Sequence, residues 1–355
     1  MKISQMLLRE DFYIINEETL DNYYTEKTGN TKLYIYPQLN AIVTVKPSKK
    51  VLEYLLCEYN VRNHAMKRFM TGLYVRLCLS SYGCMSSKKI TVHATLDDNT
   101  LIYPCNKKYR IFNFSGNTVE VIPKYGFPQD DLKREIFFRS KNELPDFVPQ
   151  LISFTSNRYI EQIIDGRPLA RISDDYDTYV KRTYNMLYEF AKGRRRIVSG
   201  SEYAEKLYAL VCKQINDKVK RHEAVKSIAG KLASVVKTAD EIILLFSHGD
   251  LQAGNIWVEN NTGKIYIIDW ESWGERSIWY DKAVLMEGLR PNGIDSYCKI
   301  EKSKEKEACV LLEDLIFQLH ELETLPGDFG SDKFEEYLVC LEMHMRGKEY
   351  GLSCE

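Results

Sequence analysis

The chain has 355 residues, with 49 Lys and Arg against 50 Asp and Glu and a formal net charge of -1 at pH 7. This length is sufficient for two domains that each bury a core, and the balanced charge argues against a global field that would attract nucleic acid or a membrane surface. The nine cysteines include no CxxC pair, which argues against a metal cluster or a disulfide framework.

The hydropathy of the chain predicts where the protein resides. Residues 1–18 lack the apolar core of a signal peptide, and no apolar run approaches the roughly 20 residues that span a bilayer. We therefore expect a cytoplasmic protein whose partners include neither nucleic acid nor a membrane. Its oligomeric state stays open.

Residues 1–88 are expected to form an N-terminal extension with short strands and a long helix. From Lys32 to Val45, β-branched and aromatic residues flank a Pro-Gln-Leu-Asn turn, which predicts two short strands. From Ser48 to Leu79, apolar residues recur at helical spacing without an internal proline. This pattern predicts one continuous helix.

Residues 89–165 have the texture of a small antiparallel sheet. Tyr109 to Lys124 contains two apolar runs around a Ser-Gly-Asn turn, and Gly and Asn favour the positive φ angles of tight hairpins. The following segment, residues 130–144, has helical spacing with Glu135 in its first half. A strand from Asn157 to Gly166 then ends in an Asp-Gly turn that resembles a hinge.

Residues 166–355 are expected to be mainly helical. Amphipathic periodicity predicts four helices, at residues 174–192, 201–220, 305–322 and 334–345. The basic triplet from Arg194 to Arg196 is typical of an exposed helix end.

The most informative stretch, Phe246 to Glu271, reads FSHGDLQAGNIWVENNTGKIYIIDWE. Its apolar runs and the Asn-Asn-Thr-Gly turn predict a hairpin that brings Asp250, Asn255 and Asp269 toward one cavity. Two carboxylates and a side-chain amide suit a Mg-nucleotide site, in which one acid orients a hydroxyl and the other ligands hold the metal.

The ordered set HGD-x4-N, followed by an apolar strand pair ending in Ile-Ile-Asp-Trp, resembles the catalytic core of the aminoglycoside phosphotransferase and choline kinase superfamily. The resemblance is motif-specific over residues 246–281 and follows element order over about residues 90–345. It implies an α+β, two-lobed protein-kinase-like fold, with a small antiparallel-sheet N-lobe at residues 89–165 and a mainly helical C-lobe at residues 166–355. Residues 1–88 would be an additional α/β segment.

The resemblance also implies roles for residues of the motif. Asp250 would be the catalytic base or hydroxyl-orienting residue, while Asn255 and Asp269 would ligate a Mg²⁺ ion that bridges the ATP phosphates. His248 would support the loop rather than transfer protons, and Asp281 would brace it.

Assignments in the small lobe depend on element order. Lys124 is the candidate for the family's phosphate-binding lysine and Glu135 for the helix glutamate that pairs with it, with Lys133 and Glu143 as the nearest competitors. From the residues alone, a strand-end lysine and a helical glutamate are more often solvated. Adenine would meet backbone groups from Glu161 to Ile163.

The sequence departs from the family pattern in two places. No GxGxxG occurs, and the segment from Tyr103 to Asn106 lies where a phosphate-covering loop is expected. Gln252 stands where many relatives have histidine, which predicts a change in substrate or loop packing.

These features predict a kinase that uses Mg²⁺ and ATP or GTP to phosphorylate a hydroxyl of a small molecule such as a sugar, amino alcohol or aminoglycoside-like compound. The alternatives are a non-catalytic pseudokinase-like binding protein and a kinase acting on a protein or peptide. HGD in place of HRD and the lack of an APE-like segment favour a small acceptor. Glu271, Asp174 and Asp175 are acids that would attract a cationic acceptor, although surface acids usually have no such role.

Overall fold

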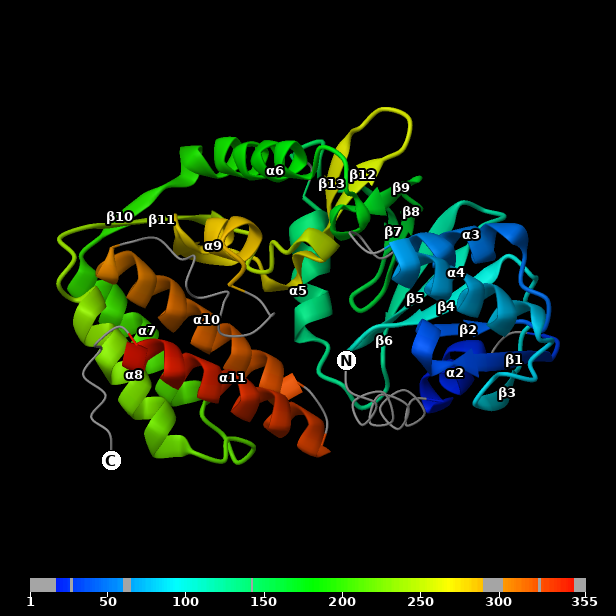
Figure 1. Cartoon of the computed structure of the whole chain (residues 1–355), viewed down its shortest axis with the longest axis horizontal. Coiled ribbons are helices and arrows are strands. Elements are labelled where there is room, and N and C mark those ends of the chain that lie inside the picture. The colour runs from blue at the N-terminus through cyan, green and yellow to red at the C-terminus, as the bar shows by residue number, and fades with distance from the viewer. Residues whose placement is uncertain are drawn as a thin grey trace. The chain divides into compact units, whose positions relative to one another are not determined.

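The computed structural model describes residues 17–25, 28–59, 65–141, 143–289, 303–324 and 327–347 (Figure 1). The chain divides into two compact units. We call the first, Met1–Tyr176 with Gly254–Glu271, the sheet unit, and the second, Asp177–Ala253 with Ser272–Glu355, the helical unit. The α+β class predicted from the sequence is confirmed.

An eight-stranded antiparallel sheet forms the centre of the sheet unit, in the order β3-β1-β2-β4-β5-β6-β8-β7. Its strands are β1 (Thr31–Tyr36), β2 (Ala41–Val43), β3 (Lys88–Val92), β4 (Thr100–Pro104), β5 (Lys108–Asn113), β6 (Thr118–Pro123), β7 (Leu151–Phe154) and β8 (Tyr159–Gln162). Because β1 to β3 continue the sheet of β4 to β8, the boundary predicted at residue 88 does not separate two bodies.

Helices cover both faces of this sheet. They are α2 (Glu17–Tyr24), α3 (Lys49–Glu58), α4 (Ala65–Ser80) and α5 (Asp130–Arg139). The side chains of β6 point alternately to the two faces of the sheet, because side chains two positions apart share a face. Val119 packs with α3 and α4 and Val121 with α5, whereas Ile122 packs in the cluster that contains Leu20 of α2.

The predicted helix from Ser48 to Leu79 is instead the two helices α3 and α4. A single helix of that length would extend about 48 Å, which is too long for both of its ends to pack on the same strands. The break lets Val51 of α3 and Val75 of α4 join one core with Leu101 of β4. The two strands predicted before this segment are confirmed as β1 and β2.

The predicted motif hairpin is also confirmed. Strands β12 (Ile256–Glu259) and β13 (Ile265–Ile267) pair antiparallel, with Ile256 opposite Ile267. Strand β9 (Gly166–Pro168) adds to β12 and completes a three-stranded sheet. A side chain at Gly166 would place its Cβ 2.4 Å from the Val258 carbonyl oxygen, so this close pairing requires glycine.

The helical unit has a core between long helices. Its helices are α6 (Tyr176–Ala191), α7 (Gly200–Gln214), α8 (His222–Val236), α9 (Tyr280–Met286), α10 (Lys304–Thr324) and α11 (Gly327–Gly347), and its strands are β10 (Arg196–Val198), β11 (Ile242–Ser247) and β14 (Gly274–Ser277). Helices α7, α8, α10 and α11 share one apolar cluster. Helix α8 was not predicted from the sequence. In the described part of the chain, no helix is long and apolar enough to cross a membrane.

A buried polar contact joins three elements of this unit. The carboxylate of Glu313 on α10 accepts hydrogen bonds from the Tyr203 hydroxyl (2.5 Å) and from the backbone N–H of Ser277 (2.6 Å). Burial raises the pKa of Glu313, although these hydrogen bonds act in the opposite direction. The contact ties α7 and β14 to α10.

Candidate functional site

The loop after β11 is held by a carboxylate at its centre. Asp281 accepts hydrogen bonds from the backbone N–H groups of His248 (3.0 Å) and Gly249 (3.1 Å). Gly249 has φ +85°, and a Cβ there would lie 2.1 Å from the Ser272 carbonyl oxygen. The HGD sequence therefore has glycine where the loop turns against the backbone, and Asp281 makes the contacts of a brace.

His248 and Gln252 position Asp250 from two sides. The fully buried ring of His248 accepts a hydrogen bond at Nδ1 from the Asp250 N–H (3.2 Å). Since Nδ1 is an acceptor in this contact, its lone pair is engaged and His248 supports the loop. The Gln252 amide donates to the Asp250 carboxylate (3.0 Å). The residue that departs from the family pattern thus contacts the proposed base directly.

In the sheet unit, the motif hairpin presents Asp269 at the end of β13. The backbone is fixed on both sides of it, because Ile268 donates to the Asn255 carbonyl (2.9 Å) and the Trp270 indole donates to Ile267 (2.7 Å). Trp270 is fully buried, with its ring 4.8 Å from that of Phe138 on α5. Asp269 itself has φ +68°, a left-handed conformation that non-glycine residues adopt at some energetic cost.

A buried lysine lies at the centre of three carboxylates in the same unit. The ammonium of Lys108, at the start of β5, is 2.5 Å from Asp269, 3.1 Å from Glu271 and 3.2 Å from Glu135. The side chain of Glu135 is fully buried, while those of Asp269 and Glu271 are 30% and 19% exposed. We call this group of four residues the Lys108 centre.

Charges within the Lys108 centre stabilise one another. Burial alone would lower the pKa of Lys108, but Asp269, Glu135 and Glu271 outweigh it and raise the pKa well above its ordinary value. Burial alone would raise the pKa of Glu135, but Lys108 and Arg139 lower it below its ordinary value. Both groups are therefore ionised at neutral pH.

Glu135 is fixed by further buried contacts. Its carboxylate accepts hydrogen bonds from Arg139 (3.2 Å) and the Tyr159 hydroxyl (3.1 Å). Arg139 also binds Glu161 of β8, which pairs at 3.1 Å with Arg110. These contacts hold the helix glutamate in place, so the sheet unit supplies a preorganised anionic site.

The lysine that pairs with Glu135 is Lys108 rather than the predicted Lys124. Lys124 lies two positions after Ile122, so both side chains point to the α2 face of the sheet. The Lys124 side chain is fully buried there, and its ammonium is 5.2 Å from the centre of the Tyr109 ring. The predicted pairing with Glu135 would require it on the opposite face, where α5 packs. The two competitors are exposed: Lys133 lies 4.0 Å from Asp130, and Glu143 is at the surface.

The side chain of Glu161 supports the structure through the two arginines. The N–H of Ile163 already donates to the Asn117 carbonyl (3.1 Å), so a ligand would have to exchange this bond. Asp174 and Asp175 are exposed, whereas Glu271 belongs to the Lys108 centre.

Two residues of the Lys108 centre were not assigned to it from the sequence. Lys108 received no role, although it lies two residues after the segment from Tyr103 to Asn106, where a phosphate-covering loop was expected. Glu271 was noted only as an acid available to a cationic acceptor. Its position two residues after Asp269, next to a tryptophan that anchors the backbone, was the available signal.

The carboxylates of Glu135, Asp269 and Glu271 also fit a divalent cation. An oxygen from each lies within 4.8 Å of the others, and the set consists of the hard ligands that Mg²⁺ prefers. Lys108 holds a positive charge among these oxygens, which shows that the surroundings favour a cation there.

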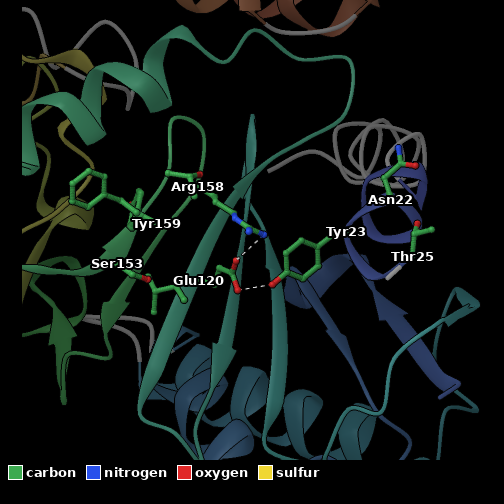
Figure 2. A pocket seen from close by; sticks show the side chains of 10 residues that line it. Asn22, Tyr23, Thr25, Glu120, Ser153, Arg158 and Tyr159 are labelled. Atoms are coloured by element: carbon green, nitrogen blue, oxygen red, sulfur yellow. Dashed lines mark hydrogen bonds and ion pairs between the residues drawn. The ribbon is translucent and has the colours of Figure 1, made fainter. Parts of the chain in front are cut away.

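A separate polar cavity of about 890 Å³ lies on the α2 face of the sheet. Tyr23 donates to Glu120, whose other carboxylate oxygen is 3.9 Å from Arg158 (Figure 2). The Tyr159 ring points away from these groups, toward its hydrogen bond with Glu135. The cavity and the Lys108 centre therefore lie on opposite faces of one sheet.

No protein-family model matches the sequence, and neither does any curated protein. Solved structures do match. The choline kinase of Streptococcus pneumoniae is 15% identical, with 70% of this chain and 92% of that chain covered and a TM-score of 0.43. An ethanolamine kinase of Plasmodium vivax is 12% identical, with 86% and 97% covered and a TM-score of 0.43.

A thermostable mutant of the aminoglycoside phosphotransferase APH(4)-Ia, in a ternary complex with ADP and hygromycin B, is 11% identical, with 73% and 93% covered and a TM-score of 0.42. A choline kinase and an aminoglycoside phosphotransferase are thus among the structures to which this chain is similar. At these identities and TM-scores, the function of this chain has to be inferred from its own residues.

Proposed function

We propose that this protein is a phosphotransferase that uses Mg²⁺ and a nucleoside triphosphate, ATP or GTP, to phosphorylate a hydroxyl of a small molecule. The observation that carries the proposal is the Lys108 centre, in which one ammonium lies within 3.2 Å of three carboxylates from α5 and from the end of the motif hairpin. A magnesium-bound phosphate chain requires a positive group that binds phosphate oxygens and carboxylates that bind the metal, and a lysine beside acids provides both.

In the proposed reaction, Lys108 binds a phosphate oxygen while Glu135 keeps the ammonium charged and oriented. Asp269 and Asn255, with Glu271 as an additional carboxylate, would hold the metal. Bound Mg²⁺ would neutralise charge that develops on the phosphate oxygens. The surrounding contacts of Arg139 fix Glu135 before substrate arrives, which favours electrostatic preorganisation.

Asp250 would orient the acceptor hydroxyl and accept its proton. Four residues separate it from Asn255, so the chain keeps the two within about 17 Å of each other. The brace from Asp281 and the Gln252 amide limit the orientations of the loop and of the carboxylate. In-line transfer to a hydroxyl needs a positioned base and bound metal, and in this chain the helical unit supplies the base and the sheet unit the metal ligands.

The experiment is a screen for nucleotide consumption over alcohols, sugars, amino alcohols and aminoglycosides, with Asp250→Asn as the blank. We expect turnover with at least one acceptor, and its loss in both Asp250→Asn and Asp269→Ala while the far-UV circular dichroism is unchanged. Equal turnover in parent and variants would rule out the enzyme assignment. Nucleotide binding without turnover by any acceptor would support the pseudokinase-like alternative.

The acceptor class follows from the same screen. A peptide library is included as a separate arm, because a protein or peptide kinase is the remaining alternative. We expect activity with small hydroxyl compounds and none with peptides. The GTP arm is run in parallel with ATP, because the sequence leaves the choice of nucleotide open.

A further inference from the structure

Helix α4 has apolar side chains on two faces. Val75, Cys78 and Leu79 are buried in the core beneath the helix. Another apolar stripe, spaced at helical intervals, faces outward and consists of Met66, Phe69, Met70, Leu73, Tyr74 and Leu77. Met66 is 74% and Phe69 67% exposed. We call this outward stripe the α4 surface.

Two more exposed apolar side chains follow the helix. Tyr82 is 61% and Met85 46% exposed in the turn after α4. Because exposed apolar side chains of soluble proteins are usually scattered, six on one face of a helix are a mark of a contact surface.

Basic residues border the α4 surface. With about 100° between successive helical residues, Lys67 and Arg76 fall on the two edges of the stripe. At its end, the ammonium of Lys46 is 5.2 Å from the Tyr82 ring, and Lys89 is exposed nearby in sequence. Residues 59–96 contain six Lys and Arg and no Asp or Glu.

The charge of this border decides between possible occupants. Two copies of the α4 surface placed against each other would bring like charges together, which disfavours a symmetric dimer. An apolar helical stripe with Lys and Arg along its edges instead complements a surface that is apolar inside and anionic outside.

We infer that the α4 surface docks the protein onto an anionic lipid bilayer. The side chains of Phe69, Leu73 and Leu77 enter the boundary between head groups and acyl chains, and Lys67 and Arg76 bind lipid phosphates at its edges. The opposite face of α4 stays packed on the sheet. This contact is peripheral, and it is independent of the proposed phosphotransfer. It replaces the expectation, based on global charge, that no membrane is a partner.

The test is co-sedimentation of the full chain with vesicles of phosphatidylcholine alone and of phosphatidylcholine mixed with an equal amount of phosphatidylglycerol. We expect at least about tenfold tighter binding to the mixed vesicles, weakened by added salt. The double variant Phe69→Asp and Leu77→Asp should lose this binding. Both side chains are exposed, so the fold and any nucleotide turnover in solution should be unchanged.

The matched control is Val339→Asp with Met343→Asp, which changes two exposed apolar residues of α11, 45% and 52% exposed, at one-turn spacing. This variant should bind vesicles like the parent. Equal binding of the α4 and α11 variants, or no preference for anionic vesicles, would overturn the inference. So would a concentration-dependent dimer that the α4 double variant abolishes, because the surface would then bind a second copy. Specific binding of an acidic protein without vesicle binding would overturn it as well.

Discussion

Lys108 and Asp269 lie 161 residues apart in the chain, and their charged atoms are 2.5 Å apart. The contact joins the first residue of β5 to Asp269, which lies two residues after the end of β13. It also places a permanent positive charge beside the acid proposed to bind metal. The exchange of this contact for nucleotide and metal is the event that the proposed reaction requires.

Lys108→Met should lower nucleotide turnover by about a hundredfold or more, because a preorganised charge on the phosphates is lost. It should also destabilise the fold by about 3 kcal/mol, since buried Glu135 would lose a partner. Steady-state kinetics and chemical denaturation measure the two effects. Lys124→Met is the matched variant and should retain turnover. Loss in Lys124→Met with normal turnover in Lys108→Met would return the phosphate-binding role to Lys124.

The stability of the parent should fall in acid because of Glu135. Its pKa is lowered in the folded state, so its contribution is present above the unfolded value of 4.5 and is lost as pH falls through the folded value. Lys108 limits stability at the alkaline end instead. Its contribution to stability is present below pH 10.5 and is lost as pH rises through its raised pKa in the folded state. Glu135→Gln should flatten the acid limb of a plot of melting temperature against pH. An unchanged acid limb would show that other groups control it.

Asp281→Ala should loosen the catalytic loop. Two buried N–H groups would lose their acceptor, at a cost of about 1–3 kcal/mol each. Asp281→Asn keeps one acceptor oxygen and should show a smaller loss of stability and of kcat. Amide hydrogen exchange at Gly249 should rise in the order parent, Asn variant, Ala variant. Identical exchange in all three would show that the brace contributes little to loop order.

Glu313→Gln should be neutral or stabilising by about 1 kcal/mol at neutral pH. The pKa of Glu313 is raised, so the protonated form is favoured in the fold, and its contribution is present below 4.5 and is lost as pH rises through the folded value. A glutamine keeps an acceptor for Tyr203 and Ser277 without a charge. Glu313→Ala is the comparison and should destabilise the helical unit, as followed by thermal melting. Marked loss in the Gln variant would mean that the ionised form is required.

Local patterns predicted the motif hairpin, because the turn formers and the apolar runs of β12 and β13 lie within one short segment. The same applies to the hairpin of β5 and β6. The contact between Lys108 and Glu135 was not predicted, because it depends on which face of the sheet each strand residue occupies. A shift of one position exchanges the faces, and the predicted pairing of Lys124 with Glu135 did not take the face of Lys124 into account.

Long-range packing explains the other differences. Apolar spacing alone did not show that residues 48–79 form two helices, since both α3 and α4 fit one helical period. Strands β1 to β3 joined the main sheet through pairings that no local pattern specifies.

At residue 269, the left-handed backbone strains an aspartate, while the proposed catalysis needs its carboxylate. A glycine would adopt φ +68° without strain, and Asp269→Gly would still leave Lys108 with two carboxylate partners. Relief of this strain would offset part of the Lys108 contact that is lost, and the substitution would yield a well-folded chain without the proposed metal ligand. Attempts to improve the thermal stability of this protein by substitution should leave residue 269 unchanged.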